Sequence, residues 1–105
     1  MKDDPLLQPL RLGRLTLPNR VVMTAVKLGY SMADGEVTER PVAFYVRRVH
    51  GVPALIVTEP LCVRPDGREL PTQLGIDSDR RTDGLRRLVD AVHGAGGRVA
   101  AHVNH

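Results

Sequence analysis

The residues best placed to do chemistry follow a buried strand near the N-terminus. The segment Asn19–Tyr30 reads NRVVMTAVKLGY. Its strand, at about 20–24, shows no alternation of polar and apolar side chains, which is typical of a strand covered on both faces in a parallel sheet. The carboxyl end of such a strand reaches the ligand crevice in α/β folds. The first candidate site therefore consists of Thr24, Ala25, Val26 and Lys27.

Lys27 is the unusual member of this group. A lysine directly after a buried strand end is ordinarily solvated. A lysine that points into the crevice instead neutralises an anionic ligand or changes how readily that ligand is reduced. Both interpretations stay open from the residue alone.

The last strand ends in a second polar group. His102 and Asn104 share one face of that strand and His105 points to the other, because side chains alternate along a strand. The two histidines cannot both coordinate one metal ion unless the strand ends between them, and no cysteine or carboxylate lies near them in sequence. A polar strand end that faces a ligand is favoured over a metal site.

Two further motifs are interpreted as structural. The glycines at 94–97 follow a helix and precede a strand, whereas a dinucleotide-binding loop follows a strand and opens a helix. We therefore expect them to end the helix. Cys62 has apolar neighbours, so a small buried filler is favoured over a reactive thiol.

Repeating patterns predict the elements that position these residues. Apolar residues at i, i+3, i+4 and i+7 indicate helices, with Thr38 and Thr82 as their N-caps, and continuous apolar runs indicate strands, with Glu59 and Pro60 ending the second strand. The expected elements are a hairpin at about 9–18, strands at about 20–24, 54–58 and 99–103, and helices at about 39–50 and 83–94.

This order of elements defines an α/β chain. Two successive crossovers make a three-stranded parallel sheet. Two helices cannot cover both faces of that sheet, and its edges keep unpaired backbone groups. The 105 residues are thus expected to be part of a larger architecture.

Composition excludes several classes of protein. Hydrophobic residues make up 42% and charged residues 26%, and no apolar run approaches the length of a membrane span. Net charge is +3, with arginines scattered and only 3% aromatic residues, which does not favour nucleic-acid binding. A single cysteine and an N-terminus without a signal peptide's apolar core predict a cytoplasmic protein.

Four motifs together resemble the old yellow enzyme family of flavin-dependent oxidoreductases, and are most similar to its branch with 2,4-dienoyl-CoA reductase and trimethylamine dehydrogenase. The motifs are PLRLGRLTLPNRVVM, DGEVTERPVAFYVRRVHG, ALIVTEP and LVDAVHGAGGRVAAHVNH. The resemblance implies the N-terminal portion of a (β/α)8 TIM barrel: a hairpin plus about two and a half βα units, in a domain that spans 1–105. A barrel typically needs about 250 residues, and closure pairs both sheet edges.

The resemblance also implies a cofactor site at the mouth of the barrel. FMN would lie against the segment after the first strand, and Lys27, where relatives carry threonine or cysteine, would bond the flavin O4 and stabilise the anionic reduced flavin. Tyr30 lies near a position that faces substrate in some relatives. The implied cofactor-binding residues are Thr24, Ala25, Val26, Lys27, Pro60 and His102, of which Ala25 replaces the family's proline and His102 replaces its glutamine.

The implied activity is transfer of hydride from NAD(P)H through FMN to an electron-poor alkene, such as an enone or dienoyl thioester. Catalytic residues are expected beyond residue 105, and an iron–sulfur cluster only in a C-terminal extension. The chain is then a truncation of a barrel whose remainder lies in cis, one piece of a split barrel completed by a second chain, or a non-catalytic remnant that acts as an interaction module. A phosphate-sugar-binding barrel of another family is a further alternative.

Overall fold

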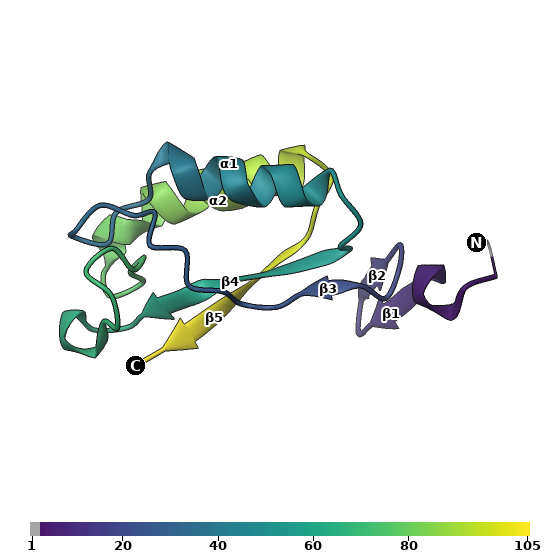
Figure 1. Ribbon diagram of the computed structural model, residues 1–105, viewed down its shortest axis with the longest axis horizontal. Helices are drawn as coiled ribbons and strands as arrows, with labels where there is room; N and C mark the ends of the chain where they lie inside the picture. The colour runs from purple at the N-terminus through teal and green to yellow at the C-terminus, as the bar shows by residue number, and fades with distance from the viewer. Residues whose placement is uncertain (1–2) are drawn as a thin grey trace.

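A three-stranded parallel sheet with both helices on one face forms the body of the molecule (Figure 1). The computed structural model describes residues 3–105. Residues 1 and 2, which belong to the N-terminal segment discussed above, lie outside the described residues. The sheet has the order β3–β4–β5, and its strands are β3 (Val22–Met23), β4 (Leu55–Cys62) and β5 (Val99–Asn104). The helices are α1 (Glu39–Val49) and α2 (Thr82–Gly94). Among residues 3–105, no helix is long and apolar enough to cross a membrane.

A small hairpin lies at the opposite end of the molecule from the carboxyl ends of these strands (Figure 1). Its strands β1 (Leu10–Leu12) and β2 (Leu15–Leu17) are antiparallel and fall within the expected span of 9–18. The turn between them is tight because Gly13 adopts a positive φ of 59°, which a residue without a Cβ tolerates. The hairpin therefore leaves the opposite end of the sheet open.

The core lies between the sheet and the two helices. Its buried cluster consists of Tyr45, Ile56, Leu61, Leu74, Leu88 and Val92. Leu88 and Val92 lie four residues apart on α2, so they share the face that meets the sheet. Each fully buried side chain of this size contributes about 1.5–3 kcal/mol, so the apolar stripes read from the sequence hold the helices in place.

The C-terminal end of α2 is the one predicted from the sequence, whereas its N-terminal end differs from the prediction. Gly96 has a φ of 93° and its amide donates to His93, while the Gly97 amide donates to Val92. This is a Schellman motif, so the glycines end the helix as expected. Thr82, predicted as the N-cap, is instead the first helical residue. Arg81 occupies the N-cap position because a short 3₁₀ turn, Asp79–Arg81, leads directly into the helix.

Strand β4 is longer than its sequence predicts. Glu59 and Pro60 were expected to end it, but pairing with β5 resumes at Pro60 and continues to Cys62. Thr58 and Glu59 together oppose one residue of β5, which is a β-bulge. Proline is tolerated there because β3 pairs only with Leu55 and Ile56, so no strand on that side requires a Pro60 amide.

Candidate functional site

The predicted site residues lie along the carboxyl edge of the parallel sheet. Lys27 follows β3, and Pro60 of β4 pairs in register with His102 of β5. Pro60 is buried, His102 is half-buried, and Lys27 is exposed. Thr24 and Val26 are exposed along the free edge beyond β3, and Ala25 between them is half-buried. Three chain segments that are far apart in sequence thus meet at one edge.

A carboxylate that the sequence did not single out connects these segments. Glu69 lies in the loop after β4, and its carboxylate forms an ion pair with the ammonium of Lys27. The Lys27 hydrogen bond lowers the pKa of Glu69, and a hydrogen bond from Asn104 and the nearby charge of His102 lower it further. Glu69 therefore stays ionised at neutral pH and faces groups from both β3 and β5.

Gln73 fixes the backbone of that loop. The side chain is only 3% exposed. Its Oε1 accepts from the Glu69 amide at 2.6 Å, and its Nε2 donates to the Pro60 carbonyl at 2.7 Å. Gln73 therefore holds Glu69 close to the bulged part of β4, next to the pair of Pro60 and His102.

Glu59 is buried behind the edge and supports the segment after β3. Its side chain is 1% exposed, Oε2 accepts from the Leu28 amide at 3.4 Å, and Oε1 has no partner among the described residues. Burial raises the pKa of this carboxyl to about 7, against smaller opposing effects of the Leu28 and Gly29 amides. The backbone amide of Glu59 donates to the hydroxyl of Tyr45 at 2.6 Å. Sequence reasoning treated Glu59 as a strand terminator, although an acid within the run ALIVTEP was a usable signal of a special position.

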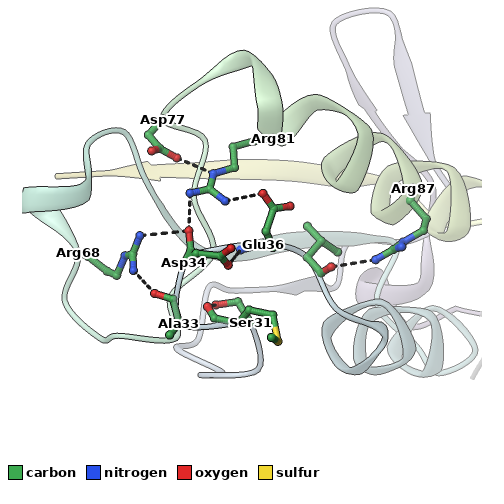
Figure 2. Close-up of polar contacts among 10 residues, drawn as sticks. Ser31, Ala33, Asp34, Glu36, Arg68, Asp77, Arg81 and Arg87 are labelled. Atoms are coloured by element: carbon green, nitrogen blue, oxygen red, sulfur yellow. Dashed lines mark hydrogen bonds and ion pairs between the residues drawn. The ribbon is translucent and has the colours of Figure 1, made fainter.

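A buried guanidinium ties the loop after β3 to the loop after β4 (Figure 2). Arg81 is 2% exposed, and it donates to Asp77 Oδ1 and to Glu36 Oε1 at 2.8 Å each, and to the Asp34 carbonyl. Arg68 also reaches the Asp34 carbonyl, at 3.3 Å. The Arg81 hydrogen bond lowers the pKa of Asp77. These contacts hold in place both loops that approach the candidate site.

Tyr30 lies against α1. Its ring meets Phe44 edge-on with centroids 6.1 Å apart, and the Arg40 guanidinium carbon lies 4.0 Å from its ring centroid. Its carbonyl accepts from the hydroxyl of Thr38 at 2.6 Å. Thr38 is the N-cap of α1 by position, but its side chain makes this contact in place of a capping bond. The substrate-facing role of Tyr30 stays a prediction.

The remaining candidates occupy structural positions. Cys62 is a free thiol with no exposed surface. The ring of His105 lies against Gly67 of the loop after β4. Within residues 3–105, no three His, Cys, Asp or Glu side chains are grouped so that they could hold a metal ion.

The parallel strands, the helices on one face and the polar carboxyl edge define the class: these are the hairpin and first βα units of a (β/α)8 barrel. The family model described as NADH:flavin oxidoreductase / NADH oxidase matches residues 5–105, and the chain belongs to that family.

Three relatives illustrate the match. The chain is 33% identical to an NADH oxidase of Thermoanaerobacter brockii over 90% of its own length and 15% of the relative. It is 36% identical to an NADH:acrylate oxidoreductase of Vibrio harveyi, over 85% of the chain and 9% of the relative. The structure of the old yellow enzyme from Trypanosoma cruzi superposes with a TM-score of 0.89 at 34% identity, covering 100% of this chain and 28% of that one. The chain thus spans less than a third of each relative.

Proposed function

We propose that this chain supplies the cofactor-facing N-terminal part of an FMN-dependent oxidoreductase that transfers hydride from NAD(P)H to an electron-poor alkene. Membership of the flavin oxidoreductase family supports the cofactor and the reductant. Similarity to an NADH:acrylate oxidoreductase supports an alkene next to an electron-withdrawing group. The family match also argues against the alternative of a phosphate-sugar-binding barrel.

The polar groups at the carboxyl edge fit the pyrimidine edge of a flavin. Lys27 and His102 offer hydrogen-bond donors for its carbonyl oxygens. Asn104 Oδ1 is buried and has no partner among the described residues, so it lacks an N–H of the kind that a flavin pyrimidine presents. This orphaned acceptor is the observation on which the cofactor assignment chiefly rests.

FMN, when bound, accepts hydride from NAD(P)H and passes it to the alkene. In the proposed site, Thr24–Lys27 line one edge of the cofactor, Pro60 packs against it, and His102 donates a hydrogen bond. Lys27 supplies a positive charge that favours the anionic reduced form, moderated by its ion pair with Glu69. Residues that hold the substrate and deliver its proton are proposed to lie beyond residue 105.

The remainder of the barrel, in the same chain or in a second one, is the proposed partner. The free edges expose Val22 (42%) on β3 and Val103 (57%) on β5. An apolar groove of about 260 Å³ lies between α2 and β5, lined in part by Leu85, Val89 and Val99. A following helix would cover this groove, a following strand would pair with β5, and the closing strand of the barrel would pair with β3, because barrel closure leaves no edge unpaired.

Reconstitution tests this function. The 105 residues are co-expressed with the T. cruzi old yellow enzyme from which the matching segment is deleted, and the complex is assayed for bound flavin and for NAD(P)H-dependent reduction of an enone. The T. cruzi segment supplied as a separate chain is the positive control, and the deleted enzyme alone is the negative control. If the positive control turns yellow and active while this chain yields neither flavin nor turnover, the proposed function is wrong and the non-catalytic interaction module is favoured.

A further inference from the structure

Two arginines of α1 stack on aromatic rings along one side of the helix. The guanidinium carbon of Arg40 lies 4.0 Å from the ring centroid of Tyr30, and that of Arg48 lies 4.0 Å from the ring centroid of Phe44. The two rings meet edge-on, with their centroids 6.1 Å apart. These four side chains form one continuous cluster, which we call the arginine–aromatic face of α1.

This face lies on the side of α1 that α2 does not cover. Tyr30 belongs to the loop after β3, and β3 is the edge strand opposite β5. Because α2 connects β4 to β5, it lies over the part of the sheet away from β3. Its contacts with α1 include the Glu39 carboxylate, which lies 3.6 Å from the Arg87 guanidinium of α2. One side of α1 is therefore packed and the other is left open.

The open side is hollowed and positively charged. Its hollow holds about 570 Å³ and is lined by Tyr30, Arg40, Ala43, Phe44, Arg47 and Arg48. Within the described part of the chain, residues 3–105, these three arginines form no ion pair with an acid. A guanidinium that stacks through its flat face keeps the N–H donors at its edge free for a carboxylate. The face thus presents fixed donors and an apolar floor, but no counter-charge.

The architecture that this chain begins places a helix at the open side. Helices form the outer ring of a (β/α)8 barrel, so α1 lies between α2 and the last helix of the ring. A second copy of this chain that met α1 through the same face would place arginine against arginine, and like charges repel. A helix that bears acids instead supplies the carboxylates that the three arginines lack among the described residues.

We propose that the arginine–aromatic face docks the last helix of the barrel, and that this helix carries two acids seven or eight residues apart with an apolar residue between them. Arg40 and Arg48 lie eight residues apart, so their Cα atoms are separated by about 12 Å along α1. Two acids at that spacing share one side of a neighbouring helix and reach both guanidinium groups. The apolar residue enters the hollow over Ala43 and Phe44. The proposal rests on the proposed function, because it takes the remainder of the barrel as the partner.

A synthetic helical peptide tests this face in the 105-residue chain. The peptide carries glutamates at i and i+8 and a leucine at i+4 in an alanine-rich helix, and its matched control carries glutamines in place of the glutamates. The glutamate peptide should produce saturable NMR shifts at the Nε–H groups of Arg40 and Arg48. The glutamine peptide should bind about tenfold more weakly, because it cannot pair with the two arginines. This comparison uses wild type, so it does not depend on the folding of a variant.

Two double variants separate a specific face from general positive charge. Arg40→Gln combined with Arg48→Gln should weaken binding of the glutamate peptide about tenfold. Arg11→Gln combined with Arg14→Gln removes the same charge from exposed positions of the hairpin and should leave binding unchanged. Arg48→Lys keeps the charge but loses the planar fork, so this single variant should also bind the peptide more weakly than wild type.

Four results of the peptide experiment would overturn the proposal. These are no saturable shift, equal binding of the two peptides, equal losses in the two double variants, or the same shifts with inorganic phosphate at the same concentration, which would indicate a site for simple anions. A completed barrel sequence whose last helix lacks such a pair of acids would also reject it. The peptide experiment involves neither flavin nor the T. cruzi enzyme. Successful reconstitution without peptide binding would therefore reject this inference alone and leave the proposed function standing.

Discussion

Arg81 should be the most sensitive polar position in the chain. Its guanidinium is 2% exposed and its partner Asp77 is 7% exposed, so solvent screens their ion pair very little. Arg81→Met leaves the Asp77 carboxylate buried without its cation, and it leaves the Asp34 carbonyl with Arg68 as its remaining donor. Breaking a buried pair by removing one partner costs about 3–5 kcal/mol. The Glu36 carboxylate, 37% exposed, adds little because water can replace its partner.

Urea denaturation at neutral pH measures this cost against a matched control. Arg86→Met, on the same helix, removes a pair whose side chains are 65% and 99% exposed and 3.8 Å apart, so it should cost about 0–1 kcal/mol. Adding Asp77→Asn to Arg81→Met should recover part of the loss, because the orphaned charge is then gone. Equal losses in Arg81→Met and Arg86→Met would refute the reasoning.

The cost should also depend on pH. The folded pKa of Asp77 is lowered by Arg81. The stability from this pair is therefore present above the unfolded pKa of aspartate and is lost as pH falls through the lower, folded value. The gap between wild type and Arg81→Met should narrow in acid, and unfolding at stepped pH checks this. A gap that widens there would contradict the assigned cause.

Three further predictions concern the core and the site. Because burial raises the folded pKa of Glu59 from 4.5 to about 7, the folded protein favours the protonated carboxyl, and wild type should lose about 3 kcal/mol of stability as pH rises between those values. Glu59→Gln removes the titrating group, so the free energy of unfolding, measured at stepped pH, should depend less on pH. The same pH dependence in wild type and Glu59→Gln would reject the role of Glu59. Leu88→Ala should cost about 2–5 kcal/mol by urea denaturation, whereas Leu6→Ala, at a side chain 57% exposed, should cost far less. In a reconstituted flavin-loaded barrel, Lys27→Ala should lower the flavin potential by about 30 mV, equivalent to about 1.4 kcal/mol for two electrons; an unchanged potential in redox titration would remove Lys27 from the flavin site.

Local sequence patterns were sufficient to predict the helices and strands and the carboxyl edge of the sheet at which the candidate site lies. The apolar stripes of α1 and α2 report which face of each helix is buried, because a helix repeats every 3.6 residues. The continuous run in β4 correctly indicates a strand that is covered on both faces, whereas β5 has the same kind of run but exposes Ala101 and Val103. Since parallel strands present their carboxyl ends at one edge, Lys27, Pro60 and His102 could be placed together without knowing any contact between them.

The sequence by itself determined the α/β class, the order of elements and the edge where ligands would bind, because the spacing of apolar residues in each segment indicates which of its side chains are buried. Only the tertiary structure decided the bulge at Thr58 and Glu59, the burial of Arg81 and the meeting of Lys27 with Glu69. Lys27 and Glu69 come from different loops, and Arg81 reaches Glu36 across 45 residues. Contacts of this kind depend on which loops the packed sheet and helices bring together. A local pattern of apolar and polar residues does not specify contacts between distant segments.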